Sequence, residues 1–163
     1  MTSTTVTNPY AADLGTREPI AAMRETVDRI ASLVAHWNPA QFERTYAPGK
    51  WTARQILTHL AQTELALGTR ARMALATPNY ASQAFDQDRW MVRESALSGS
   101  DAVAALVAVN AMNRALFSAL TDADRATAFT HPEYGALTVD WVMQQMAGHL
   151  RHHLVQIEQI AAR

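Results

Sequence analysis

Apolar residues recur at intervals of three and four positions in four long stretches of the chain, which is the period of an amphipathic α-helix. The stretches run roughly over residues 18–37, 51–75, 100–120 and 138 to near the C-terminus. In the first of them the apolar stripe consists of Ile20, Met23, Val27, Ile30 and Val34. Four such segments predict an all-α fold, a four-helix bundle with long connections between the second and third helices and between the third and fourth.

Proline and short polar residues mark the expected ends of these helices. Pro19 suits a first helical turn, where its missing N–H costs nothing, and Pro39 disfavours helical geometry at the residue before it. Thr52 is a good N-cap for the second helix, and Ser100 and Asp101 are good capping residues for the third. The sequence therefore contains residues that mark the ends of the helices, in addition to the apolar period that marks the helices themselves.

The segments between the helices are expected to be less regular. Residues 79–99 form a long connection, in which residues 85–90 favour a short helix that continues toward Glu94. Residues 129–137 contain Pro132 and Gly135 and predict a turn or a short hairpin-like loop. We expect residues 1–16 to be a flexible N-terminal arm and residues 17–163 to form a single domain.

The composition indicates one globular domain and excludes several kinds of site. The chain has 163 residues, of which 48% are hydrophobic and 18% charged. The absence of cysteine excludes disulfides, thiolate metal sites, iron–sulfur clusters and a cysteine nucleophile. A formal net charge of −1, with no block of like charge, argues against a nucleic-acid or membrane partner. The sequence has no apolar run of about 20 residues and no signal peptide, so we expect a cytoplasmic protein.

The histidines offer the clearest candidate chemistry. His149 and His153 are four residues apart in the last helix, so they share one face and can bind one ion together. His152 leaves the same helix about 100° away and is not expected to share that ion. His59 lies on the apolar side of the second helix, and a bundle brings such faces together. The pattern predicts a three-histidine metal site with open positions, as in catalytic centres.

Buried histidines also have a plainer interpretation. A single histidine on an apolar face is most often a hydrogen-bonded core residue, and two of them four residues apart leave the two interpretations about evenly balanced. Burial of three imidazoles without a ligand costs desolvation free energy, which favours a metal. The stretch HLRHH is not the HExxH motif of zincins, because Leu150 stands where the general-base glutamate would be.

At these residues the chain resembles the DinB/YfiT-like superfamily. Residues 49–64 fit the approximate pattern GKW(S/T)xxxIxxHLxxTE, which is the first motif of that family. Residues 85–88 resemble the acidic loop that follows in many members. Gly135 with Thr138, and then residues 148–153, resemble the closing motif GxxT…GHxxHH. The similarity extends from about residue 46 to 160, with the three motifs in the family's order and spacing.

The resemblance implies a four-helix bundle, often a homodimer, with a metal held by His59, His149 and His153. These are the same three residues that the spacing singles out. Relatives include candidate metal-dependent hydrolases and enzymes that use bacterial low-molecular-weight thiols as S-transferases or isomerases. Many members have no assigned reaction.

Other polar residues near the motifs are weaker candidates. Glu64 is expected to pair with a base such as Arg70 or Arg89 at a seam of the bundle, with a catalytic role as the alternative. Asp88, together with Asp86, lies in a long connection of the kind that is often functional, although solvated loop carboxylates are commoner. Gln145, one turn before His149, could orient a ligand or a bound water, or could be a plain surface residue. The catalytic residues therefore stay unknown, with Gln145, Asp88 and Glu64 as candidates.

Two functional hypotheses remain from the sequence. The first is an enzyme with one divalent ion, zinc or nickel given three neutral nitrogen ligands, that acts on a small molecule either by hydrolysis or by transfer of a low-molecular-weight thiol. The lack of a glutamate base slightly favours the thiol reaction, since a metal-bound thiol needs less help in losing its proton. The second is a non-catalytic, stress-associated dimeric bundle in which a metal or buried histidines only stabilise the fold. The alanine-rich third helix allows close helix approach, so we expect a homodimer.

Overall fold

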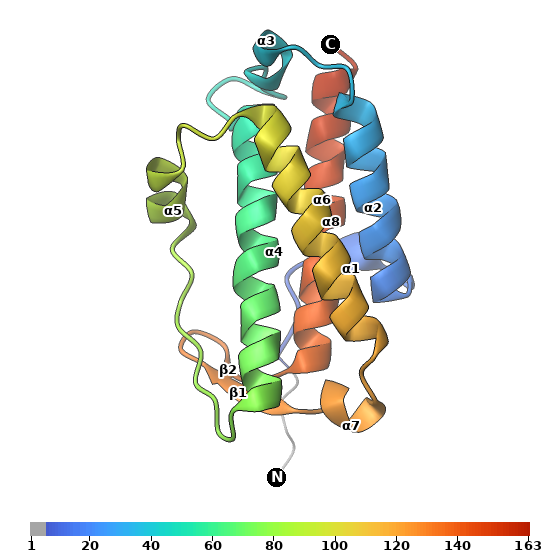
Figure 1. The fold of residues 1–163 in the computed structure, drawn as a ribbon, viewed down its shortest axis with the longest axis vertical. Helices are drawn as coiled ribbons and strands as arrows, with labels where there is room; N and C mark the ends of the chain where they lie inside the picture. Colours follow the sequence, from blue (N-terminus) through green and yellow to red (C-terminus); the bar gives the residue numbers. More distant parts are fainter. Residues whose placement is uncertain (1–5) are drawn as a thin grey trace.

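Four long helices form the body of the protein. The computed structural model describes residues 6–163, and the elements pack as an elongated bundle (Figure 1). The long helices are α2 (Pro19–Val34), α4 (Ala53–Ala76), α6 (Gly99–Ser118) and α8 (Val139–Ala161). Helix α4 packs against α6 and α8, and α2 packs against the same two helices. The predicted four-helix bundle is confirmed.

The helix ends follow the capping chemistry of the sequence with one displacement. The Thr52 hydroxyl accepts a hydrogen bond from the Gln55 backbone N–H, and the Gln55 side chain accepts one from the Thr52 N–H, which forms a capping box. Helix α6 begins earlier than predicted, because Ser98 rather than Ser100 caps it and accepts from the Asp101 N–H. Each cap satisfies a backbone donor that would otherwise lack a partner.

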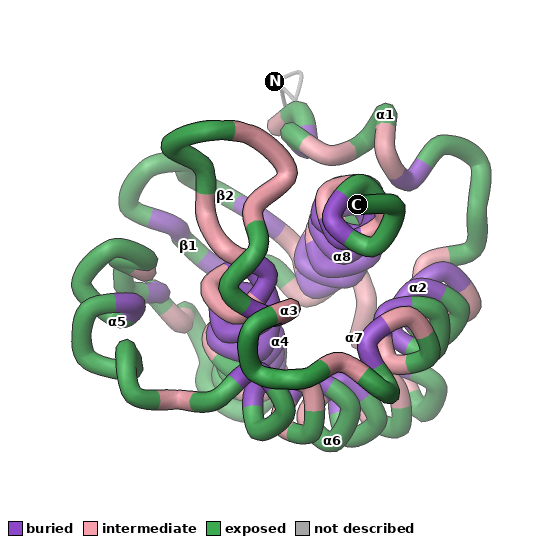
Figure 2. Tube along the Cα trace, turned by 90° about the horizontal axis from the view of Figure 1, so that it is seen from above, coloured by how far each residue is buried: buried purple, intermediate pink, exposed green. Residues whose placement is uncertain are grey.

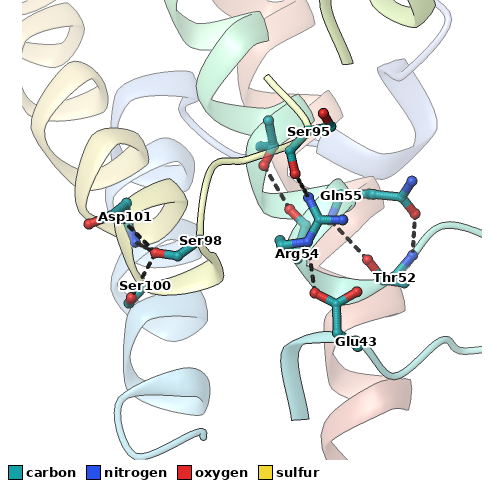
Figure 3. A network of polar contacts seen from close by, with 9 residues as sticks. Glu43, Thr52, Arg54, Gln55, Ser95, Ser98, Ser100 and Asp101 are labelled. Carbon is teal, nitrogen blue, oxygen red and sulfur yellow. Dashed lines mark hydrogen bonds and ion pairs between the residues drawn. The ribbon is translucent and has the colours of Figure 1, made fainter. Parts of the chain in front are cut away.

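Arg54 forms hydrogen bonds that link the beginning of α4 to two other segments (Figure 3). Its Nε donates to Glu43 Oε1 over 2.7 Å, and its Nη1 donates to the Ser95 carbonyl oxygen over 3.2 Å. Glu43 follows the short helix α3 (Pro39–Phe42), and Ser95 lies just beyond α5 (Gln87–Arg93). The helix that carries His59 is therefore held at its N-terminal end by both of its flanking connections.

A short antiparallel hairpin closes one end of the bundle. Its strands are β1 (Ala128–His131) and β2 (Gly135–Thr138), and Gly135 has the positive φ of 72° that the turn requires. The hairpin-like loop expected here is confirmed, and the short helix α7 (Asp122–Arg125) precedes it. The long connection after α4 runs beside this hairpin, since the Thr130 N–H donates to the Tyr80 carbonyl and the Ser82 N–H to the Thr130 carbonyl.

The apolar faces of the four long helices meet in one core (Figure 2). Its fully buried side chains include Met23, Ile30, Leu57, Leu106, Met146 and Ile157. In α8 the buried stripe consists of Val142, Met146, His149, His153, Ile157 and Ile160. None of the helices in residues 6–163 is long and apolar enough to cross a membrane.

The N-terminal segment packs along α8. The Trp141 indole N–H donates to the Val6 carbonyl over 3.0 Å, and Arg151 Nε donates to the Asp13 carbonyl over 3.0 Å. The short helix α1 (Ala11–Leu14) buries Leu14 in the core. Apolar and hydrogen-bonded contacts thus attach the predicted arm to α8 from residue 6 onward. Residues 1–5 of that predicted arm lie outside the described residues.

Candidate metal centre

Three histidine side chains converge between α4 and α8. His59 comes from α4, whereas His149 and His153 lie one turn apart on α8, and all three are buried. His59 Nε2 lies 2.9 Å from His149 Nε2. One ring nitrogen from each of the three residues falls within 4.8 Å of the others. The structure thus brings together the three residues that the spacing and the family resemblance singled out.

Burial keeps these imidazoles neutral near neutral pH. Burial, and then the proximity of His153, lower the pKa of His59 to about 3. Burial also lowers the pKa of His153 to about 4, although the Gln156 hydrogen bond opposes that shift. Burial, followed by the neighbouring histidines, lowers the pKa of His149 well below its usual value. Neutral rings keep a nitrogen lone pair available for coordination.

A polar neighbour orients one member of the cluster. His153 Nδ1 lies 2.7 Å from Gln156 Oε1, and because an amide oxygen only accepts, Nδ1 carries the proton. The lone pair of His153 therefore sits on Nε2. The Gln156 amide nitrogen lies 3.4 Å from the Tyr46 hydroxyl, which holds the amide in this orientation. Such an outer hydrogen bond is typical of histidines that ligate metals.

The donor set fits a divalent metal ion. Three neutral imidazoles are borderline ligands of the kind that zinc and nickel prefer. His59 Nδ1 is buried and has no hydrogen-bond partner among residues 6–163, so the only polar contact of this ring is with another histidine of the cluster. The His59 and His149 Nε2 atoms face each other at 2.9 Å, where at most one of them can carry a proton. These features suit three residues that share an ion.

His152 lies outside this cluster. It is 43% exposed on its side chain, and its Nδ1 lies 3.5 Å from Asp13 Oδ1. Its ring packs on Tyr10 with a centroid separation of 5.4 Å. The different azimuth predicted for this residue explains why it contacts the N-terminal segment instead of His59.

The three histidines line two cavities. One cavity of about 180 Å³ is lined by His59 and His149, and we call it the histidine cleft. A second, of about 280 Å³, is lined by His153 together with Trp51 and Lys50. The two share no lining residue. The cluster is therefore accessible to small molecules along two routes.

Residues that the sequence analysis did not select line the histidine cleft. They include Tyr10, which directly precedes α1, Arg70 from α4, and His131 and Tyr134 from the hairpin. The Tyr10 ring packs edge-on against His149, with centroids 5.0 Å apart. Arg70 lies on the same face of α4 as His59, eleven residues later, and this spacing is the signal that could have identified it.

His131 has a defined tautomer. Its Nδ1 accepts hydrogen bonds from the backbone N–H groups of Glu133 at 3.2 Å and Tyr134 at 3.4 Å. The neutral ring therefore carries its proton on Nε2, which has no protein partner among residues 6–163. Burial, and then the nearby Arg70 guanidinium, lower the pKa of His131. This residue can donate a hydrogen bond to a group that enters the cleft.

The three weaker candidates are placed in different parts of the structure. Gln145 lines the histidine cleft, and its Oε1 is buried without a partner among the described residues. Asp88 is exposed on α5 and lines none of the cavities described above. Glu64 lies between α4 and α6 and accepts a 2.9 Å hydrogen bond from Asn113 Nδ2. The expectation that Glu64 pairs with Arg70 or Arg89 is wrong, because its side chain faces α6.

Comparison with known proteins identifies the family. The model of the DinB superfamily matches residues 22–157. The chain belongs to the DinB superfamily. Among curated DinB-like relatives, a candidate metal-dependent hydrolase of Oceanobacillus iheyensis is 27% identical over 132 residues, which is 80% of this chain and 76% of the relative. The candidate metal-dependent hydrolase YfiT of Bacillus subtilis is 24% identical over 88% of this chain and 83% of its own.

Solved structures share the DinB fold seen here. YfiT from Bacillus subtilis, described as a probable metal-dependent hydrolase with an unusual four-helix bundle topology, superposes with a TM-score of 0.80 over 89% of this chain and 85% of YfiT. A mycothiol-dependent maleylpyruvate isomerase superposes with a TM-score of 0.71 over 90% of this chain and 62% of the isomerase, at 13% identity. At these identities the likeness extends to the fold alone.

Proposed function

We propose that this DinB-superfamily protein is a metal-dependent hydrolase of a small molecule, with His59, His149 and His153 as the ligands of one divalent ion. The observation that carries the proposal is the convergence of three buried, neutral imidazoles beside a cleft of about 180 Å³. The hydrolase names of its curated relatives are consistent with that arrangement.

The roles of the chain's own residues follow from their contacts. Gln156 holds the His153 ring in the tautomer that has its lone pair on Nε2. The rings of Tyr10 and Trp51 pack on His149 and His59, with centroids 5.0 and 4.9 Å away, and limit the movement of these imidazoles. His131 Nε2–H donates to an oxygen that gains negative charge in the cleft. A zinc or nickel ion held there supplies a Lewis acid that polarises a carbonyl or lowers the pKa of water or of a thiol.

Transfer of a low-molecular-weight thiol is the second candidate. Two observations favour it: the histidines line two separate cavities, which suits two cosubstrates, and Glu133 is the only carboxylate-bearing residue among the described residues that line the histidine cleft. Hydrolysis needs a base for water, whereas a thiol is acidic enough to ionise with less help.

One experiment separates these functions and the non-catalytic bundle. The purified protein is analysed for metal content and then assayed, with and without a chelator, against nitrophenyl esters and against monochlorobimane plus a thiol. We expect about one ion per chain and a chelator-sensitive turnover of the ester. Turnover only with thiol and monochlorobimane would support the transferase instead. A bound ion with no turnover in either assay would support the non-catalytic bundle.

The matched variants are His59→Ala and His152→Ala. The first removes a member of the cluster, and the second removes an exposed histidine of α8 that contacts Asp13 instead. We expect the first variant to lose both metal and turnover, and the second to keep both. Loss of metal in His152→Ala alone would contradict the proposed ligand set.

A further inference from the structure

Arg70 stands where the histidine cleft meets a larger cavity. It lines the cleft together with His59 and His149, and it also lines an adjoining cavity of about 580 Å³. Phe85 is the other residue that lines both. A side chain at such a junction contacts any molecule long enough to extend from one cavity into the other.

The Arg70 guanidinium has no anionic partner in the described part of the chain. Its Nη2 donates to the Gln83 carbonyl oxygen over 2.8 Å, and no carboxylate lies within 4.0 Å. Burial lowers the pKa of Arg70, and Tyr80, Glu133 and Tyr134 oppose this shift. A half-buried guanidinium retains its charge, so it has donors and positive charge available for a ligand.

The adjoining cavity is mainly apolar. Its walls come from one face of α4 and from the connection that runs beside that helix, and they include Leu65, Met73, Tyr80, Phe85 and Trp90. Phe85 and Trp90 pack edge to face with ring centroids 4.8 Å apart. Leu65, Met73 and Trp90 are exposed by 48, 41 and 37%, which is unusual for large apolar side chains on one surface. A ligand with an apolar body would cover them.

We propose that the substrate is an amphipathic carboxylate: Arg70 binds its carboxylate, and the 580 Å³ cavity accommodates its apolar body. This inference rests on the proposed function in placing the reacting group near the histidines. Guanidinium and carboxylate form paired hydrogen bonds, which makes Arg70 selective for a planar anion. A cavity of this volume lies in the usual range for small-molecule sites.

The separation of His59 and Arg70 along α4 indicates the length of that substrate. His59 and Arg70 are eleven residues apart on one face of α4, which corresponds to about 16 Å along the axis. Thr63 and Leu67 lie between them and line the same cleft. The Arg70 side chain can extend over part of this separation, so the carboxylate lies between the reacting bond near the histidines and the apolar body in the larger cavity.

The test measures binding separately from turnover. Isothermal titration of the purified protein uses 4-phenylbutyrate and its neutral amide, 4-phenylbutyramide, which share an apolar body and differ in charge. We expect the acid to bind at least tenfold more tightly than the amide. In Arg70→Met this preference should disappear while metal content stays unchanged, so a failure of this inference is distinguishable from a failure of the metal site.

Two further variants complete the design. Arg89→Met is the matched control, since Arg89 is an exposed arginine paired with Asp86 that lines neither cavity, and it should bind both probes as the wild type does. Ala66→Phe fills the apolar cavity from α4 and should weaken both probes at least tenfold, even if Arg70→Met does not fold.

Three results of these titrations would contradict the inference. Equal affinity for acid and amide, or a preserved preference in Arg70→Met, would overturn the inference. Absence of heat with both probes would also overturn it.

Discussion

The backbone of Tyr10 lies directly on the α-carbon of Gly148. A Cβ added to Gly148 would stand 2.7 Å from Tyr10 Cβ and would collide with the Tyr10 carbonyl oxygen. Only glycine permits this approach, and the position is next to His149, on which the Tyr10 ring packs. The N-terminal segment therefore covers the histidine cluster because one residue of α8 has no side chain.

We predict that Gly148→Ala destabilises the protein by about 1–3 kcal/mol. Alanine in a helix ordinarily stabilises relative to glycine, so a fall in the free energy of unfolding would identify the lost contact with Tyr10. Urea denaturation measures it. The control is the same substitution in a chain that lacks residues 1–12, where the usual stabilisation should return; a destabilisation of equal size there would contradict the role of Tyr10.

The proposed ligand set makes a second prediction. Removal of any one of three ligands leaves two, which hold an ion much less well, so His59→Ala should bind zinc at least 100-fold more weakly than the wild type. Competition with a chromogenic chelator gives the affinity. His36→Ala, at an exposed histidine far from the cluster in sequence, is the control and should match the wild type. An unchanged affinity in His59→Ala would rule out this residue as a ligand.

Gln156 provides a third prediction, because it acts on the metal site only through His153. Gln156→Leu removes the acceptor of the Nδ1–H bond and should lower zinc affinity about tenfold. Gln156→Glu keeps an acceptor at this position and should bind at least as tightly as the wild type. A purely structural role would weaken stability in both variants and leave the ratio of their zinc affinities near one.

Much of this architecture was predictable from the sequence. The helical period and the cap at Thr52 placed α4 to within a residue or two, and the i,i+4 spacing of His149 and His153 placed them on the buried stripe of α8. These predictions succeeded because they depend on local geometry, which adjacent residues determine. The partners of Glu64 were missed for the opposite reason: a helical net gives the face on which a residue lies but not which helix it meets.

Local sequence patterns also could not predict which residues of the connections between helices line the cleft. His131 enters the cleft because β1 pairs with β2 and the connection after α4 joins Thr130 through backbone hydrogen bonds. Tyr10 reaches the site through contacts with a helix more than 130 residues later in the chain. Such long-range contacts leave no periodic signal in the sequence.

Glu64 leads to the fourth prediction, which concerns stability and pH. Its carboxyl is fully buried, and burial raises its pKa to about 7, while hydrogen bonds from Asn113 and Asn110 and the charge of Arg114 oppose the shift. Between pH 4.5 and 7 the folded state then holds a proton that the unfolded state has released. The folded protein therefore loses stability as pH rises through this window, by about 3 kcal/mol at most, and loses no more above it.

Glu64→Gln should remove this dependence, since glutamine is neutral at every pH and its Oε1 can still accept from Asn113 Nδ2. Near pH 4.5 both proteins carry a neutral side chain and should have similar stability, whereas at pH 8 the variant should be more stable. The difference between their urea unfolding curves isolates Glu64 from the buried histidines, whose lowered pKa values destabilise both proteins equally as pH falls below about 6.5.

Glu25→Gln, at an exposed site, should follow the wild type at all pH values. If the stability difference between Glu64→Gln and the wild type stays constant from pH 4.5 to 8, Glu64 is already ionised in the fold, and Arg114 rather than burial governs its charge.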